Sequence, residues 1–307
     1  MALTTTATLS SVMQAYYDKR FLKRATAEFV YKQLGRMGTV PKGEGKTVVW
    51  NRYTNPTAKT SALTEGTDPT PSGLSATLIS ATISQYGNFE QVTDILELAS
   101  IDNSIASTVE LLAYEASVSI DTVIRNVVDD TTTILYASGV ANRTSIIATD
   151  VVTVTDIRKV VRQLKGQNAK PQRKGGSYMA VIHPDVEYDL QGDSNWTNAH
   201  QYTDSALGGV YNGEVGKLYG VRFLNTTQAP VLTNSASAGA STDVYQSLVF
   251  GEEAFGVSEL QNLRTYVDSP SPRSALRMYS DVGWKAGFTT KILNDNFMVS
   301  LESAATQ

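Results

Sequence analysis

The sequence predicts an α+β fold. Three observations support this class. Apolar residues recur at helical spacing through residues 109–127, two strand-like segments flank a long polar loop at residues 54–73, and further strand-like segments follow as far as residue 301. These helices and strands are interleaved, but without the regular βαβ order that a doubly wound parallel sheet requires.

The composition limits the chemistry that the chain can perform. Its 307 residues suffice for one large domain or two modest ones, and it has no cysteine. Disulfides, thiolate catalysis and thiolate metal sites are therefore excluded, as fits a reducing cytoplasm. A net charge of -4 lacks the strong positive field of a dedicated nucleic-acid-binding protein. No segment approaches the roughly 20 apolar residues of a membrane span, so we expect no membrane partner.

The beginning of the chain predicts a mobile arm followed by a helix. Residues 1–9 are small and polar and resemble neither a signal peptide nor a transit peptide. Residues 11–34 carry apolar side chains at loose helical spacing, with four cations between them: Lys19, Arg20, Lys23 and Arg24. A solvated helix face explains these cations, and an anion-binding face is the alternative.

Two strand-like segments predict a two-stranded ribbon. Thr47–Tyr53 is rich in strand-forming residues, and residues 74–86 alternate apolar and polar side chains. The loop between them, residues 54–73, is crowded with Thr, Ser and Pro. A loop of this length is uncommon in a compact domain unless it is functional or contacts another molecule. We therefore expect the tip of a projecting hairpin.

A single long helix is predicted next, with Asp102 or Ser104 as its N-cap. Its apolar stripe repeats every three or four residues: Val109, Leu112, Ala113, Ala116, Ile120, Val123, Ile124 and Val127. At about 1.5 Å per residue, the helix would be on the order of 35 to 40 Å long. A coiled coil is the competing interpretation, but the stripe is too broad and includes Ser117 and Ser119.

A second, basic helix is predicted after Thr155 and Asp156. Opposite its apolar face lie Arg158, Lys159, Arg162 and Lys165, and Lys170, Arg173 and Lys174 then extend the basic run with no acid among them. Phosphate or the acids of a neighbouring subunit would suit these cations, and a solvated face is the alternative. Strand signals follow at Tyr178–Ile182, after a turn at residue 213, at residues 245–250 and 263–267, and twice between residues 282 and 301.

The sequence offers no credible catalytic, cofactor or metal site. The phrase ending in Gly45, Lys46 and Thr47 resembles a phosphate-binding loop, but Val40 occupies the position of its first glycine. His183 and His200 are the only histidines, and neither has a partner at diagnostic spacing. We expect His183 to be a strand-end residue that bonds to the backbone.

Projecting segments without catalytic residues suggest self-assembly. A hairpin that cannot pack on its own domain is stabilised by lying on a neighbour, where apolar burial contributes about 25 cal/mol per Å². Seven residues are therefore predicted to contact a neighbouring subunit: Trp50, Tyr53, Leu63, Glu65, Arg158, Lys159 and Arg162.

Several short segments of the sequence are distinctive enough to indicate a protein family. They are Pro41-Lys-Gly-Glu-Gly-Lys-Thr-Val, Leu63-Thr-Glu-Gly, Ser84-Gln-Tyr-Gly-Asn-Phe, Asp156-Ile-Arg-Lys, Ala169-Lys-Pro, Ile182-His-Pro-Asp-Val, Gly213-Glu-Val-Gly-Lys-Leu-Tyr-Gly-Val-Arg-Phe and Val282-Gly-Trp-Lys-Ala. With these phrases the chain resembles, over nearly its full length, the major capsid proteins of tailed bacteriophages with the Hong Kong 97-type fold. The branch that it resembles is the one typified by the podophage N-four.

The resemblance implies a Hong Kong 97-type capsid fold with five parts. They are an N-terminal arm at residues 1–35, an extended E-loop hairpin at residues 40–90, the spine helix and the first part of the peripheral domain at residues 91–175, the axial domain at residues 176–264, and the returning strands of the peripheral domain at residues 265–307.

The resemblance also implies the function. Such a chain is a structural protein of the virion that catalyses nothing and needs no cofactor or metal. It assembles in the host cytoplasm into hexamers and pentamers, which form an icosahedral head around double-stranded DNA. Its partners are other copies of itself, a scaffolding protein, a portal, a decoration protein in some phages, and packaged DNA that it contacts without sequence recognition.

The sequence also departs from the best-known member of this family. That member joins its subunits through an isopeptide bond and sheds a long N-terminal scaffolding segment. Here about ten residues precede the arm helix, and no pair of Lys and Asn is identifiable for such a bond. We therefore expect no autocatalytic crosslink and a separate scaffolding protein.

Two other interpretations stay open from the sequence. An encapsulin-like nanocompartment has the same fold and would enclose an enzyme in place of DNA. The Thr- and Ser-rich strands would also suit a β-rich adhesin or sugar-binding module, although such proteins usually carry a secretion signal and no long central helix.

Overall fold

The computed structural model describes residues 10–306 except 42, 44, 64, 67, 101–102, 173–175, 197–213 and 237–241. The expected mobile segment 1–9, the cations Arg173 and Lys174, and His200 therefore lie outside the described residues. The α-helices are α1 (Ser10–Glu28), α2 (Asp94–Ala99), α3 (Ser104–Val128), α4 (Val154–Gly166) and α5 (Pro184–Gly192). The 3-10 turns are η1 (Lys32–Leu34), η2 (Ala137–Gly139), η3 (Arg143–Ser145) and η4 (Asp295–Phe297).

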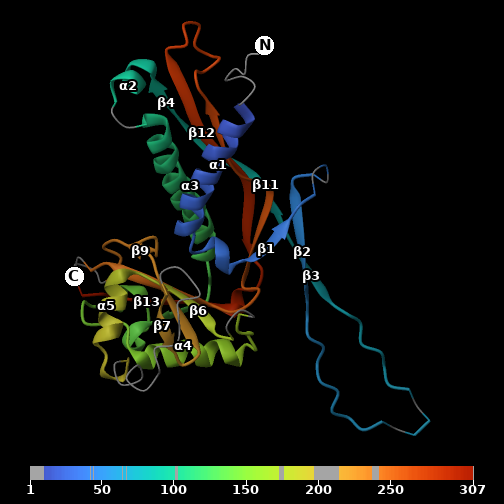
Figure 1. Cartoon of the computed structure of the whole chain (residues 1–307). Coiled ribbons are helices and arrows are strands. Elements are labelled where there is room, and N and C mark those ends of the chain that lie inside the picture. The colour runs from blue at the N-terminus through green and yellow to red at the C-terminus, as the bar shows by residue number, and fades with distance from the viewer. Residues whose placement is uncertain are drawn as a thin grey trace.

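The strands form three sheets, and the α+β class is confirmed. They are β1 (Arg36–Thr39), β2 (Thr47–Tyr53), β3 (Ala76–Thr82), β4 (Ser84–Thr93), β5 (Ile134–Tyr136), β6 (Tyr178–Ile182), β7 (Glu214–Leu218), β8 (Val221–Asn225), β9 (Val231–Leu232), β10 (Val244–Phe250), β11 (Phe255–Asp268), β12 (Tyr279–Ile292) and β13 (Met298–Ser303). The molecule is elongated, with one sheet near each end of its long axis and a hairpin at its side (Figure 1).

A four-stranded sheet in the order β1-β11-β12-β4 extends along α1 and α3 (Figure 1). β1 is parallel to β11, and the other two pairs are antiparallel. The inward side chains of the sheet share one apolar core with the two helices, and this core includes Phe21, Val109, Ile120, Val282 and Trp284. Burial of this continuous apolar surface holds the arm helix, the long helix and the sheet together.

A seven-stranded sheet forms the other end of the molecule, in the order β5-β13-β10-β6-β8-β7 with β9 paired to β10. One face packs with α4 and α5 in a second core that includes Ile157, Leu164 and Phe223. The opposite face contributes Met179 and Phe250 to the first core, so the two cores meet across this sheet. We call the sheet with α4 and α5 the seven-stranded unit.

The long helix is confirmed, but its cap differs from the two candidates. The side-chain oxygen of Asn103 accepts the Ala106 N–H at 2.9 Å, so Asn103 is the N-cap and Ser104 is the first helical residue. The 25 residues of α3 give a length of about 37 Å. The α4 helix begins earlier than predicted, because Thr153 and Asp156 form a capping box that places its first residue at Val154.

Three predicted boundaries were wrong. The helix predicted to reach residue 34 ends at Glu28, and a separate 3-10 turn follows. The strand predicted at residues 74–86 is two strands, β3 and β4, which separate at the buried Ile83. The turn and strand predicted after residue 213 are the hairpin β7–β8, whose turn residues Tyr219 and Gly220 both have positive φ.

Candidate subunit interface

The hairpin formed by β2 and β3 projects from the side of the molecule (Figure 1). The strands pair from Thr47–Thr82 to Tyr53–Ala76, and the Thr54 N–H extends the ladder to the Ser75 carbonyl at 2.9 Å. Every described residue from 51 to 78 is exposed. An exposed segment of this length has little to stabilise it within its own subunit, so its surface is available for another molecule.

Two side chains hold the base of the hairpin on its own subunit. Trp50 is half-buried, and a Cβ atom placed on Gly256 would lie 3.2 Å from the Trp50 Cε2 atom. The Arg52 guanidinium donates to the Leu293 carbonyl at 3.1 Å and to the Asn294 side chain at 3.3 Å. Trp50, predicted to contact a neighbour, therefore packs at least partly against β11 of its own chain.

The other hairpin residues predicted to contact a neighbour lie away from their own subunit. The exposed fraction is 61% for Tyr53 and 73% for Leu63, and Glu65 is also exposed. Leu74 and Leu78, which were not among the predicted contacts, are similarly exposed at 77% and 70%. The hairpin thus carries leucine and tyrosine side chains whose burial would favour association.

The predicted cations of α4 belong to the seven-stranded unit, and the structure does not bring them to the hairpin. The Arg158 guanidinium lies over the Tyr219 ring, 5.7 Å from its centroid. The Lys159 Nζ atom is 2.8 Å from Asp156 Oδ1 within the same helix, so its charge is partly balanced. Arg162 is exposed on the outer side of α4. Arg158 and Arg162 are exposed on this helix face, which agrees with both predicted alternatives, a solvated face and a contact with phosphate or with the acids of a neighbour.

A buried carboxylate, which the sequence analysis missed, joins the arm to the long helix. Asp121 on α3 accepts the backbone N–H groups of Val30 at 2.6 Å, Tyr31 at 3.2 Å and Lys32 at 3.1 Å. These donors follow the end of α1, so the carboxylate replaces the hydrogen bonds that a continued helix would have made. The available signal was an acid inside the apolar stripe, beside Ile120.

Burial raises the pKa of Asp121 to about 6, against the opposing effect of its three backbone hydrogen bonds and of the Lys32 ammonium. Lys32 in turn forms an ion pair with Glu259 on β11, with Nζ and Oε1 2.6 Å apart. The segment after α1 is thereby fixed between the long helix and the four-stranded sheet.

An exposed apolar cluster lies at the end of the molecule opposite the seven-stranded unit. The Asp94 N–H at the start of α2 donates to the Met278 carbonyl at 3.0 Å, which places α2 beside the β11–β12 connection. The exposed fractions are 69% for Ile95, 86% for Leu98 and 80% for Leu276. Clustered apolar side chains of this kind are typical of contact surfaces.

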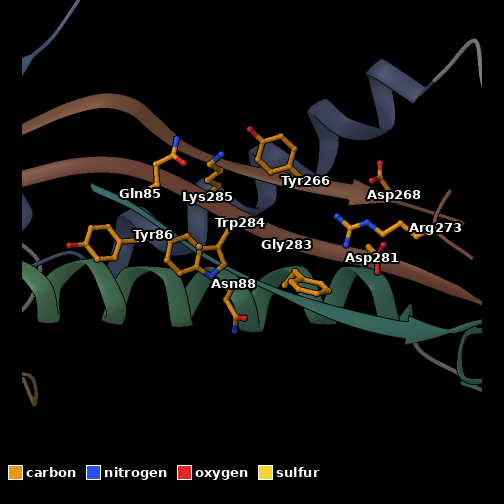
Figure 2. A pocket seen from close by; sticks show the side chains of 12 residues that line it. Gln85, Tyr86, Asn88, Tyr266, Asp268, Arg273, Asp281, Gly283, Trp284 and Lys285 are labelled. Carbon is orange, nitrogen blue, oxygen red and sulfur yellow. The ribbon is translucent and has the colours of Figure 1, made fainter. Parts of the chain in front are cut away.

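The four-stranded sheet presents a shallow groove on the face turned away from α3. Figure 2 shows Gln85, Tyr266, Asp268 and Lys285 on this face, whereas Trp284 points toward α3. The groove encloses about 380 Å³ and continues at Gln85 into a second hollow of about 830 Å³ beside the base of the hairpin. We call the two together the sheet trough.

The remaining motifs do not form a chemical site in the described part of the chain. His183 caps α5 by accepting the Asp185 N–H at Nδ1, at 3.3 Å, as expected of a strand-end residue. Lys46 and Thr47 lead into strand β2, whereas a phosphate-binding loop leads into a helix. Among the described residues, no group of three His, Asp or Glu side chains is arranged to hold a metal ion. None of the described helices is long and apolar enough to cross a membrane.

Comparisons with known proteins agree with this fold. A family described as phage capsid protein matches residues 76–293, a range that runs from β3 to the end of β12 and includes α3. Comparison with curated protein sequences gives no match.

Solved structures share the fold at low sequence identity. The capsid of Ralstonia phage GP4 has a TM-score of 0.71 and 12% identity, covering 91% of this chain and 92% of that chain. The cyanophage Pam1 capsid has a TM-score of 0.67 and 13% identity, covering 92% of both chains. A virus-like particle from Pyrococcus furiosus has a TM-score of 0.57 and 9% identity, covering 94% of this chain and 99% of that chain.

Proposed function

We propose that this chain, which belongs to the phage capsid protein family and builds a capsid shell, forms rings of five and six subunits that close around double-stranded DNA. The main support for this proposal is the family match, which spans the long helix and most of both large sheets. The projecting hairpin supports the ring, because a projection received by a different surface of the next copy produces a head-to-tail contact that can close.

The structure suggests domain bounds that differ from those expected from the sequence. We propose a peripheral domain made of α3 and the strands β1, β4, β11 and β12, and an axial domain made of the seven-stranded unit. In the expected division β5, α4 and β13 belonged to the peripheral domain, but all three pack in or on the seven-stranded sheet. The start of β11, expected in the axial domain, pairs within the four-stranded sheet.

We propose the hairpin as the principal contact between neighbouring subunits, through Tyr53, Leu63 and Glu65. The exposed cluster around Leu98 and Leu276 would supply a second contact surface at the end of the molecule. Trp50 would act mainly by holding the hairpin at its base, given its position against Gly256. The α4 cations Arg158, Lys159 and Arg162 would make, at most, secondary contacts through exposed charge.

Further partners follow from a role in a phage head. The virion is the location of this family, and we propose that assembly takes place in the host cytoplasm with a scaffolding protein and a portal. A decoration protein would bind the outside of the shell in phages that encode one. Packaged DNA would meet exposed cations such as Lys19 and Lys23 through its phosphates, without reading sequence.

We also propose that the chain is not an enzyme and forms no covalent crosslink between subunits. The family and the fold are those of structural proteins. Denaturing gels of assembled shells should therefore show a single band at the mass of the monomer. A ladder of covalent multimers in such a gel would contradict this part of the proposal.

The experiment that tests the shell function is electron microscopy of the recombinant chain, alone and with a candidate scaffolding protein. Closed shells or rings of five and six are expected. A matched variant in which residues 57–72 are replaced by a short turn should fold with the same circular dichroism and yet form no shells, because it lacks the contact surface. A wild-type chain that stays monomeric under all conditions would contradict the proposal.

The content of the particles distinguishes a phage head from an encapsulin-like compartment, because the two would have similar shells. Particles purified from phage-infected cells should contain DNA, and a protein cargo in its place would favour the compartment. The family match does not favour a β-rich adhesin.

A further inference from the structure

We propose that a calcium ion binds at the C-terminal end of the long helix, between the carboxylates of Asp129 and Asp130 and the hydroxyl group of Thr290. This site goes beyond the proposed shell function and does not depend on it. Four observations support the site: a hollow that the three residues share, buried oxygen atoms without partners, negative charge around these atoms, and the end of α3 beside them.

The three side chains come from two segments that meet where α3 ends. Asp129 is the C-cap residue of α3, and Asp130 follows it in an exposed turn. Thr290 lies near the end of β12. It is on the face of the strand that packs against α3, because Phe288, two residues earlier, belongs to the core that the sheet shares with this helix. The three residues line one hollow of about 370 Å³.

Two oxygen atoms of this group lack the partner that a folded protein normally supplies. Asp129 Oδ1 and Thr290 Oγ1 are both shielded from solvent, and neither has a hydrogen-bond partner among the described residues. Thr290 as a whole is only 7% exposed. A buried oxygen without a partner costs free energy and is rare in native proteins, where an ion or a water molecule commonly satisfies it.

The charge around these atoms favours a cation over a water molecule. Burial and, after it, the nearby Glu302 carboxylate raise the pKa of Asp129, and this rise outweighs the opposing effects of Arg125 and Arg143. The Asp129 carboxylate is therefore short of positive charge in its surroundings. The last carbonyl groups of a helix also carry partial negative charge, so the end of α3 attracts a cation to the same place.

The two cationic side chains nearest the hollow do not supply this charge. The Arg125 guanidinium is directed to other acceptors, since it donates to the Gln228 carbonyl at 3.0 Å and to the Asn126 side chain at 2.9 Å. Lys291 lines the hollow but is exposed, so its long side chain is free to extend its ammonium group into water. A metal ion would therefore bind beside these residues without displacing an ion pair that either of them makes with Asp129.

Calcium suits these ligands better than magnesium does. Calcium accepts roughly six to eight oxygen ligands in flexible geometry, including carboxylates, carbonyls and water molecules, whereas magnesium requires a near-ideal octahedron and loses its water reluctantly. Asp130 is exposed, so water molecules can complete the coordination from the open side of the hollow. Two carboxylates are few for a calcium site, and we therefore expect a dissociation constant on the order of 0.1 to 1 mM.

The position of the ion gives it a structural effect. The end of α3 lies where the four-stranded sheet approaches the seven-stranded unit (Figure 1). The turn after Asp130 is already attached to the segment after β12, because the Thr131 hydroxyl donates to Asp295 Oδ1 at 2.7 Å. An ion between Asp129 and Thr290 would add a second connection at this junction, so calcium should stabilise the folded subunit.

Calcium titration of the full-length chain tests the site. After treatment with a chelator, isothermal titration calorimetry should show one calcium ion bound per chain, and about 10 mM calcium should raise the unfolding temperature. Asp129→Asn should weaken binding about tenfold or more. Glu90→Gln, an exposed acid on β4, is the matched control and should bind calcium as the wild type does. A wild type that binds no calcium, or Asp129→Asn that binds it as tightly as the wild type, would overturn the proposal.

Thr290→Val distinguishes an ion ligand from a residue that only supports the fold. Valine keeps the shape and removes the unsatisfied hydroxyl group, so without calcium the variant should unfold at the wild-type temperature or above it. With calcium its unfolding temperature should rise less than that of the wild type. An equal rise would contradict the site, as would an equal rise of the wild type in magnesium. Neither measurement requires shells, so failure of the site leaves the shell function intact.

Discussion

Asp121 shows how much of the arrangement of this subunit depends on one side chain. Its two oxygens satisfy three backbone N–H groups at the point where α1 has ended and the chain turns toward β1. Buried amide groups without an acceptor are costly, so the carboxylate determines where the arm meets the long helix. The carboxylate therefore fixes the position of α1 relative to α3.

Replacement of this side chain should be strongly destabilising. Asp121→Ala leaves three N–H groups without their acceptor and should lower the free energy of unfolding by about 3 kcal/mol. Chemical denaturation followed by circular dichroism measures this change. Asn126→Ala, on the exposed face of the same helix, should change it by less than about 0.5 kcal/mol. Equal effects of the two substitutions would show that the three hydrogen bonds contribute little.

The raised pKa of Asp121 also predicts a pH dependence. Because burial raises this pKa from its ordinary value of 3.8 to about 6, the folded chain binds the proton more tightly than the unfolded chain does. The stability contributed by protonation is complete below about pH 4 and is lost as the pH rises through about 6, by up to about 3 kcal/mol. The free energy of unfolding of Asp121→Asn, measured by denaturation between about pH 4 and pH 7, should not show this decline. An equal decline in the variant would show that another group causes it.

At the scale of elements, the hairpin is held at its base and unsupported along its length. Arg52 forms the polar half of this attachment through the Leu293 carbonyl and the Asn294 side chain. Trp50 forms the apolar half. The attachment determines the direction in which an otherwise exposed loop points.

Loss of the polar attachment should loosen the hairpin without unfolding the subunit. In Arg52→Ala, amide hydrogen exchange should become faster in β2 and β3 and stay unchanged in α3, because only the hairpin loses a contact. The yield of shells should fall with it. Lys59→Ala, in the loop itself, is the control that should leave the exchange in both strands as in the wild type. Unchanged exchange in Arg52→Ala would mean that Trp50 alone holds the hairpin.

The sequence predicted those elements whose signal is local. The stripe of α3 and the composition of β2 and β3 identified the spine helix and the hairpin, because periodicity and strand propensity act within a segment. The pairing of β4 with β12, nearly two hundred residues later, carries no such signal. For the same reason the sequence did not reveal that β13 lies between β5 and β10, or that Trp50 packs against Gly256.

The predicted contact residues of the hairpin lie in a long exposed loop, whereas those of α4 were predicted from charge. Leu63 and Glu65 are exposed as a contact at the tip requires. The cations of α4 were ambiguous from the sequence, because a solvated face and a binding face have the same composition. The trough was not predictable, since it depends on glycines of two strands that meet only in the folded chain.

At the scale of the whole molecule, assembly should change which parts of the chain a protease can reach. In the free subunit, trypsin should cleave first at Lys59, which lies in the exposed loop of the hairpin. In shells the same bond should be protected, because the loop would be covered by a neighbour. Mass spectrometry of the fragments measures both states, with Lys165 on α4 as an internal reference. Equal cleavage at Lys59 in subunits and shells would show that the hairpin stays uncovered.

The hairpin has the proportions of a lever. Its strands of seven residues are about 23 Å long, and the loop adds up to about 35 Å in an extended conformation. Trp50 is the middle residue of β2, so about 45 Å of hairpin extends beyond it, and a rotation of roughly a tenth of a radian there would move the tip by about 5 Å. Small angular changes at this point would move the tip far enough for one rigid subunit to meet neighbours at the different angles of the proposed five-membered and six-membered rings. Curvature of the shell would then be accommodated at a joint of two side chains, while the cores of the subunit keep their packing.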